Sequence, residues 1–237
     1  YVGHTGPVWA VRFSPLGSNP YLATASSDMT VKLWNKKKGT VVFNFSGQFS
    51  AAVRALTFSA DGKSILAGSD EGKIVLWNAV LAIELADDPL VPINNVTRLQ
   101  VLPFPRRKDG ESCFLLVGLC LMEPSLTPHT PSLKSFPESS STLVAGHSKG
   151  IRSLAFHIDG RHFFSGGDDH SIRQWRIDDK NGRALLRRLF KGHESPVMSM
   201  DLNPDSSLLV SSSADGLFKI WTTLDGVCRR TVSAHAG

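Results

Sequence analysis

Three residue types that serve hydrolases, a histidine, a serine and an aspartate, recur close together in this sequence. His147, Ser165 and Asp169 form one such set, and a histidine oriented by a carboxylate can act as the general base for a serine nucleophile. Similar sets, one with Thr in place of Ser, follow Gly3-His4 and Gly192-His193, and each set is followed by a tryptophan. Repetition of a structural unit explains three sets in register, whereas catalysis needs only one. The sequence therefore predicts that the protein is not an enzyme.

Other signatures of catalysis and cofactor binding give no positive prediction. The sequence contains no H-E-x-x-H zinc motif and no G-x-G-x-x-G dinucleotide motif. Residues 68–74 resemble a phosphate-binding loop, but Ile74 stands where a Ser or Thr must reach a magnesium ion. The histidines have no metal-ligand spacing with the cysteines, which are Cys113, Cys120 and Cys228. We therefore expect no cofactor, no metal and no small-molecule substrate.

The composition is that of a globular protein, with 41% hydrophobic and 20% charged residues. Lys and Arg number 26 against 21 Asp and Glu, which gives a formal net charge of +5. The basic residues fall in separate short clusters, a pattern that favours solvated loops over one nucleic-acid surface. The longest apolar run, 114–122, is far shorter than the roughly 20 residues of a membrane helix. An odd cysteine count and the lack of a visible secretory signal favour an intracellular protein, cytoplasmic or nuclear.

A repeated unit organises the chain. Each copy has a Gly-His pair, an alternating apolar stretch, a turn, an apolar stretch with small residues, an Asp, and a β-branched stretch that ends in Trp. Complete copies begin at residues 3, 146 and 192, and another copy that begins at Gly47 keeps the hydrophobic pattern while lacking the His and the Asp. Apolar residues at every second position, bounded by turn residues, predict short β-strands.

The spacing of the closing tryptophans sets the predicted number of units. Trp34 and Trp77 are 43 residues apart and Trp175 and Trp221 are 46 apart, whereas Trp77 and Trp175 are separated by 98 residues, about two periods. The spacing therefore predicts five units. They cover residues 1–40, 41–84, a degenerate 85–142 with a Pro- and Ser-rich insert at 123–141, 143–184, and 185–232. The insert is interpreted as a mobile surface loop, or alternatively as a gene-model or splice artefact.

These repeats resemble the WD40 family of β-propellers, in which each unit of roughly 40 to 45 residues forms a four-stranded blade. The resemblance implies an all-β fold whose blades stack radially, because a single blade cannot bury both of its faces. The chain begins with Tyr1 rather than Met, and it starts and stops at the same point of the repeat. We therefore expect a fragment that forms an open arc of a larger, typically seven-bladed ring.

The resemblance also implies a hydrogen-bonded network in each complete unit. It joins the His before the first strand, a Ser or Thr, the Asp of the following loop, and the closing Trp. The implied network residues are His4, Thr24, Asp28 and Trp34; His147, Ser165, Asp169 and Trp175; and His193, Ser211, Asp215 and Trp221.

Partners of this family usually bind at the face where the central channel opens. The matching positions lie just after the first apolar residue of the first strand and just before the network Asp. In this sequence they are Trp9, Arg54, Arg152 and Met198, and Ser27, Asp70, Asp168 and Ala214. Trp, Arg and Met are types that protein interfaces favour. As an alternative, the Arg and Asp residues of a unit pair with one another.

We predict a non-catalytic scaffold that docks peptide or protein partners on the channel-opening face, within a multisubunit complex. Two alternatives stay open. One is a WD40 subunit of a ribonucleoprotein assembly for ribosome biogenesis or RNA processing, which only the basic charge balance supports. The other is a sensor or regulatory region of a larger multidomain protein.

Overall fold

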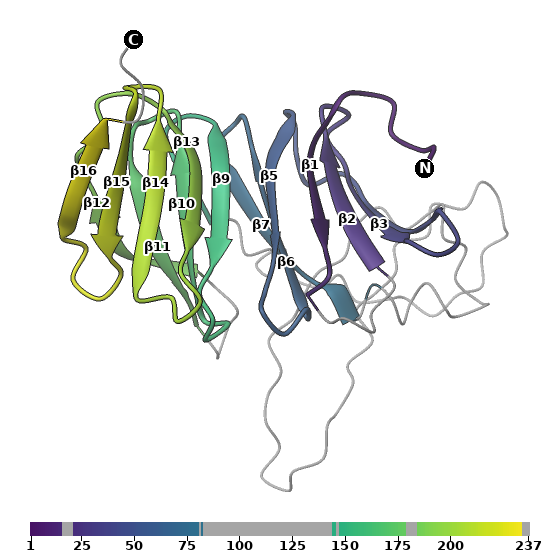
Figure 1. Ribbon diagram of the computed structural model, residues 1–237. Helices are drawn as coiled ribbons and strands as arrows, with labels where there is room; N and C mark the ends of the chain where they lie inside the picture. The colour runs from purple at the N-terminus through teal and green to yellow at the C-terminus, as the bar shows by residue number, and fades with distance from the viewer. Residues whose placement is uncertain (16–20, 81, 83–143, 146, 179–183, 234–237) are drawn as a thin grey trace, which may run out of the picture.

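Four antiparallel sheets of four strands each make up the described part of the protein. The computed structural model describes residues 1–15, 21–80, 82, 144–145, 147–178 and 184–233, and sixteen strands lie within them. Figure 1 shows the sheets following one another along the chain, from the purple N-terminal sheet to the yellow C-terminal one. The predicted all-β architecture is confirmed. No helix in these residues is long and apolar enough to cross a membrane.

Within each sheet the strands are adjacent in chain order, from an inner strand to an outer one. The first sheet contains β1 (Val8–Phe13), β2 (Tyr21–Ser26), β3 (Val31–Asn35) and β4 (Thr40–Phe45). The second contains β5 (Val53–Phe58), β6 (Ser64–Ser69), β7 (Lys73–Asn78) and β8 (Val144–Ala145). The third contains β9 (Ile151–Phe156), β10 (His162–Gly167), β11 (Ile172–Ile177) and β12 (Ala184–Phe190). The fourth contains β13 (Val197–Leu202), β14 (Leu208–Ser213), β15 (Leu217–Thr222) and β16 (Cys228–Ser233).

Tight turns join the first and second strands of the second and third sheets. Gly62 and Gly160 both have φ of 66°, a backbone conformation that costs glycine little because it has no Cβ. The aspartates before them, Asp61 and Asp159, accept a hydrogen bond from the backbone N–H two residues later, as Asx turns do. The two Asp-Gly pairs therefore set the hairpins locally.

Neighbouring sheets pack face to face, because each sheet is apolar on both faces. Three apolar clusters join the first sheet to the second, the second to the third, and the third to the fourth. The inner strands are neighbours in the same order, with β1 against β5, β5 against β9, and β9 against β13. In the described residues no apolar cluster joins the fourth sheet to the first, so the four sheets form an open arc.

The outer strands β4, β8 and β12 complete the first three sheets, although each lies almost wholly in a later predicted unit than the rest of its sheet. The unit predicted over 85–142, with its insert 123–141, lies outside the described residues. Strand β8 follows that segment in the chain, yet it pairs with β7 and completes the second sheet. The second and third sheets share one apolar cluster and are therefore neighbours. The second sheet thus takes its outer strand from residues that lie just before the third sheet in the chain, and the unit predicted over 85–142 stays a prediction.

Candidate functional site

The predicted hydrogen-bonded networks assemble in the first, third and fourth sheets. In the first sheet, His4 Nδ1 lies 2.8 Å from an Asp28 carboxylate oxygen, and His4 Nε2 lies 2.6 Å from Thr24 Oγ1. Trp34 Nε1 donates to the same hydroxyl oxygen at 2.7 Å. The third and fourth sheets repeat this arrangement with distances of 2.6 to 2.9 Å. All twelve implied residues are therefore placed in three networks.

The proton arrangement of these networks follows from their atoms. The Trp N–H donates to the hydroxyl oxygen, so the hydroxyl proton is free to bond the His Nε2, and the His Nδ1–H donates to the carboxylate. This series of hydrogen bonds requires a neutral imidazole with its proton on Nδ1. Burial lowers the pKa of His147, against the opposing effect of Asp169, which is consistent with the neutral form. Each histidine is thus held by a bond on both ring nitrogens, and its role is structural.

The network aspartates are held as carboxylates. Burial raises the pKa of Asp169, but hydrogen bonds from Ser171 and His147 outweigh burial and bring that pKa to about 2. Asp28 behaves in the same way, with a pKa of about 2. The serine hydroxyls of these sets are buried, since Ser165 is 0% and Ser211 is 1% exposed, so a substrate does not reach them. The His, Ser and Asp sets are therefore not arranged as active sites.

The second sheet replaces the polar network with an apolar one. Phe49 takes the position of the network histidine and packs edge-on against Trp77, with ring centroids 5.9 Å apart. The His4 and His193 rings lie at about the same distance from their tryptophans. Ala67, which is fully buried, takes the place of the Ser or Thr. Glu71 keeps one feature of the network aspartates, because its carboxylate accepts the backbone N–H of Ser50 at 3.1 Å.

Residues 146–150 have the G-x-S-x-G spacing of a nucleophile elbow, but Ser148 is not placed as such a nucleophile. Ser148 lies in the connection between β8 and β9, whereas a nucleophile elbow joins a strand to a helix. Its backbone N–H donates to Asp169. In addition, the described residues contain no group of three or more His, Cys, Asp and Glu side chains placed to hold a metal ion. Cys228 is exposed and free, and the other two cysteines lie outside the described residues.

The eight predicted partner-binding positions lie at one end of the four inner strands. Four of them are the unpaired residues of β-bulges, since the pairing register shifts across each one. A bulge re-aims the side chain of its extra residue. The four bulge residues are Trp9, Arg54, Arg152 and Met198.

The other four positions, which directly follow the second strand of each sheet, are placed by backbone hydrogen bonds. Their N–H groups donate to carbonyls just before the inner strand, at 2.8 to 3.0 Å. This pairing brings each of them beside the bulge of its own sheet. These positions are Ser27, Asp70, Asp168 and Ala214.

Six of the eight side chains form one continuous row across three sheets, here named the ladder. Trp9 Nε1 donates to Ser27 Oγ at 2.5 Å, and the Arg54 guanidinium carbon lies 3.8 Å from the centroid of the Trp9 ring. Arg54 Nε donates to both oxygens of Asp70, at 2.9 and 3.1 Å. The ladder thus passes from the first sheet to the second through a cation–π contact between Trp9 and Arg54.

The ladder continues from the second sheet to the third through a shared carboxylate. Arg152 forms a two-pronged pair with Asp168, at 2.6 and 2.8 Å, and its third nitrogen lies 3.6 Å from Asp70. The hydrogen bond with Asp168 raises the pKa of Arg152. Asp70 therefore joins arginines of two sheets, and the predicted Arg–Asp pairing within a sheet is only part of the arrangement.

The row of eight positions has a large apolar side chain, open to solvent, at each end: Trp9 in the first sheet and Met198 in the fourth. The side chains of Arg54 and Arg152 are 23% and 31% exposed, whereas Trp9 and Met198 are 50% and 51% exposed. Met198 and Ala214 in the fourth sheet extend the row without any polar contact shown for them in the described residues. One residue that the sequence analysis missed is Gly150. A Cβ there would lie 3.0 Å from an Asp168 oxygen and 3.2 Å from the Asp70 Cα, so a larger residue would crowd the ladder.

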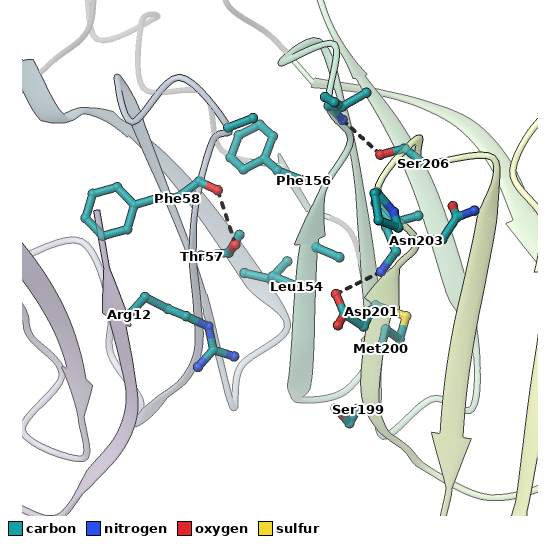
Figure 2. Close-up of a pocket in the computed structure, with 15 residues that line it drawn as sticks. Arg12, Thr57, Phe58, Leu154, Phe156, Ser199, Met200, Asp201, Asn203 and Ser206 are labelled. Atoms are coloured by element: carbon teal, nitrogen blue, oxygen red, sulfur yellow. Dashed lines mark hydrogen bonds between the residues drawn. The ribbon is translucent and has the colours of Figure 1, made fainter. Parts of the chain in front are cut away.

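A second feature that the sequence analysis missed is a groove of about 550 Å³ further along the inner strands. It is lined by residues of β1, β5, β9 and β13 and of the turns that follow the last three of these strands. Figure 2 shows Arg12 on one wall and Asp201 on the opposite one. In the sequence, Arg12 and Asp201 share one feature that could have indicated the groove: each is the fifth residue of an inner strand.

Comparison with known proteins supports the repeat assignment. The family model described as "WD domain, G-beta repeat" matches residues 1–35, 39–78, 138–176 and 184–222, which is more than half of the chain. Each match covers the first three strands of one sheet, and the last three matches also include the outer strand of the sheet before.

Several curated proteins are similar to this chain over most of its length. The chain is 27% identical to Periodic tryptophan protein 2 of Arabidopsis thaliana, over 98% of this chain and 24% of that protein. It is 26% identical to Apoptotic protease-activating factor 1 of Rattus norvegicus, over 99% of this chain and 20% of that protein. It is 29% identical to Nuclear distribution protein PAC1 of Arthroderma benhamiae, over 76% of this chain and 42% of that protein. The chain thus spans less than half the length of each of these relatives.

Proposed function

Because the chain belongs to the WD40 repeat family of β-propeller proteins, we propose that it is a non-catalytic scaffold that docks peptide or protein partners at the ladder end of its sheets. It acts in this proposal within an intracellular complex, in the cytoplasm or the nucleus. The observation that carries the proposal is the row of four bulge residues, which turns large side chains toward one end of four neighbouring sheets.

The ladder is already ordered, which favours binding. Fixing long side chains at an interface costs about 0.5–1.5 kcal/mol for each one. Arg54 is held between the Trp9 ring and Asp70, and Arg152 is held by two carboxylates. A partner that packs on the ladder therefore avoids most of this cost.

The ladder also suggests how a partner is recognised. Its arginines and aspartates neutralise one another, so the row carries no net charge to attract an acidic or basic peptide. The groups left for a partner are the exposed apolar surfaces of Trp9 and Met198, of the kind that interface hot spots use. We propose that these two side chains anchor the partner and that the paired charges between them provide a flat polar surface.

The test is affinity capture with the tagged chain, followed by direct binding measurements with each purified captured partner. The Trp9→Ala/Met198→Ala variant should lose at least one partner. A matched control is Leu185→Ala/Leu224→Ala, which removes two side chains that are 56% and 88% exposed elsewhere on the surface. Circular dichroism confirms that both variants are folded. Equal binding by the two variants would show that the ladder end is not the docking surface.

A second candidate function, RNA binding in a ribonucleoprotein assembly, is favoured by one feature of the outer strands. Arg187 on β12 and Arg229 and Arg230 on β16 are exposed. Binding to phosphates through such groups weakens with salt, by about 0.7 in log affinity per log unit of salt for each phosphate contacted on a single strand. Replacing the three arginines with Gln should therefore flatten the salt dependence of any RNA binding. A partner docked through Trp9 and Met198 should show little salt dependence.

The third possibility, a regulatory region of a larger multidomain protein, stays a prediction. It fits the small share of each relative that this chain covers. Determining the complete reading frame that contains this chain tests it directly.

A further inference from the structure

The groove on the inner strands, which the proposed function does not use, is lined by free strand edges. Each of β1, β5, β9 and β13 pairs with one strand only, so its other edge has no sheet partner. The groove of about 550 Å³ is lined by residues of these strands, and Figure 2 shows Leu154 between Arg12 and Asp201. The sheets of β5 and β9 each pack against a sheet on both sides. The middle of the groove therefore does not depend on what lies beyond the first or the fourth sheet.

The pairing pattern of the third sheet shows which backbone groups lie on the free edge of β9. The His157 N–H donates to the His162 carbonyl at 2.9 Å, which makes these two residues a hydrogen-bonded pair. Hydrogen-bonded and non-hydrogen-bonded pairs alternate in an antiparallel ladder. Ala155 therefore bonds to β10, whereas Leu154 and Phe156 direct their N–H and C=O groups away from it. All three residues line the groove.

In the other three inner strands, the fifth residue bonds to the free edge of its own strand. Its side chain forms a hydrogen bond with the backbone of an adjacent residue, at 2.9 to 3.3 Å. The residues that do so are Arg12, Thr57 and Asp201. The fifth residue of β9 is Ala155, whose methyl side chain forms no hydrogen bond. Of the four described inner strands, β9 therefore lacks this bond.

Strand β9 also lacks a second bond that β13 has. Met200, the fourth residue of β13, donates its N–H to Ser153 Oγ of the third sheet at 2.9 Å. Leu154 is the equivalent residue of β9, but the second sheet has Ala55 at the position of Ser153. The described residues thus show no partner for the edge groups of Leu154 and Phe156. An edge of this kind can pair with a strand of another chain.

Two charged side chains face the groove from opposite walls. Arg12 and Asp201 are both exposed, and among the described residues each bonds only to the backbone of its own strand. A strand paired with β9 directs successive side chains alternately to its two faces, one toward the second sheet and the other toward the fourth. Arg12 lies beyond the second sheet, and Asp201 lies on the fourth. A side chain on one face is therefore directed toward a positive charge, and its neighbour in sequence is directed toward a negative one.

We infer that an extended peptide of a partner protein binds in this groove by pairing with β9, and that it carries an acidic residue next to a basic residue. Main-chain hydrogen bonds hold the peptide to Leu154 and Phe156, and alternate side chains select it. The acidic residue pairs with Arg12 and the basic residue pairs with Asp201. The ladder uses the second residue of each inner strand, whereas the peptide pairs with the fourth and sixth residues of β9, so this inference does not rest on the proposed function.

The experiment is a titration of the isotope-labelled chain with capped peptides, followed through the chemical shifts and the hydrogen exchange of its amides. The probe is Val-Thr-Glu-Lys-Thr-Val, whose flanking residues favour an extended conformation. Its binding should slow the exchange of the Leu154 and Phe156 amides. Peptides with Glu-Glu or Lys-Lys at the centre should bind about fivefold more weakly, as expected when one exposed ion pair is lost.

Charge-reversed variants test each wall of the groove. Asp201→Lys makes both walls basic and should bind the Glu-Glu peptide best, whereas Arg12→Glu makes both walls acidic and should bind the Lys-Lys peptide best. Lys38→Glu is the matched control, because it changes the net charge as Arg12→Glu does, at an exposed residue outside the groove. This control should keep the preference for Glu-Lys. Circular dichroism checks that all three variants are folded.

A backbone N-methylated form of the Glu-Lys peptide separates strand pairing from charge attraction. The methyl groups remove peptide N–H donors, so binding should weaken about tenfold. Unchanged exchange at Leu154 and Phe156, or equal binding of the N-methylated peptide, would overturn pairing with β9. A peptide preference that the Arg12 and Asp201 variants do not alter would overturn the inference as well, as would the absence of binding by every peptide.

Discussion

Removing the carboxylate of Asp215 tests the role of the hydrogen-bonded networks most directly. Asp215 accepts bonds from His193 Nδ1 at 2.9 Å and from the backbone N–H groups of Glu194 and Leu217 at 3.2 and 2.9 Å. The His193 side chain is only 1% exposed. Asp215→Ala therefore leaves a buried imidazole N–H without an acceptor, which costs about 1–3 kcal/mol. With the two backbone donors included, we expect a loss of about 2–4 kcal/mol in the free energy of unfolding.

Glu71 provides a matched control at the equivalent position of the second sheet. Its carboxylate accepts from the backbone N–H and the hydroxyl of Ser50, both at the surface, and Phe49 stands in the place of the network histidine. Glu71 has no buried histidine to accept from, although a hydrogen bond from the buried Ser69 helps to lower its pKa, so Glu71→Ala should cost only about 1 kcal/mol. A difference of about 2 kcal/mol corresponds to roughly 4–8 °C in melting temperature for a chain of this size.

The assay is thermal unfolding followed by tryptophan fluorescence, with hydrogen exchange of β13 to β16 measured in parallel. The second measurement is needed because a terminal unit of a repeat array can unfold before its neighbours. Asp215→Asn is a further control, since its amide oxygen still accepts the His193 proton and should restore part of the loss. Equal destabilisation by Asp215→Ala and Glu71→Ala would refute the reasoning, because it would mean that the buried histidine gains nothing from its carboxylate.

Three further predictions concern the third sheet. The pKa of Asp169 is lowered from 3.8 to about 2 and that of His147 is lowered from 6.5, so both groups stabilise the fold above their unfolded pKa values. Denaturant titrations should therefore show the free energy of unfolding falling as the pH drops below about 6.5. It should fall again between pH 3.8 and about 2, where Asp169 contributes at most about 2 kcal/mol. Ser165→Ala removes the partner of two buried ring nitrogens and should cost about 2–4 kcal/mol in urea unfolding, whereas a cost under 1 kcal/mol would contradict the network. Gly150→Ala directs a methyl group at Asp168 and should weaken partner binding more than it weakens the fold, as calorimetry and melting would show; a fold loss with intact binding would contradict the ladder's role.

Much of the fold of this protein can be predicted from short stretches of its sequence. Strands, Asp-Gly turns and closing tryptophans depend on residues close together in the chain, so period-two patterning and turn residues predicted the all-β sheets. The resemblance to WD40 repeats also placed the three networks on the residues that form them, because a set such as His147, Ser165 and Asp169 falls within one repeat. The partner-binding positions followed from the same resemblance, and their binding role is still a proposal.

Other features depended on contacts between distant segments. The repeat period did not reveal that Val144–Ala145 completes the second sheet, since pairing across more than 60 intervening residues leaves no local pattern. The bridge from Asp70 to Arg152 and the need for Gly150 arise only where two sheets meet. Nor did the pattern show that Val11 and Val210 are 48% and 40% exposed, because both look like core residues in their own strands. A strand's residues determine its two faces, but packing between sheets determines which face is buried.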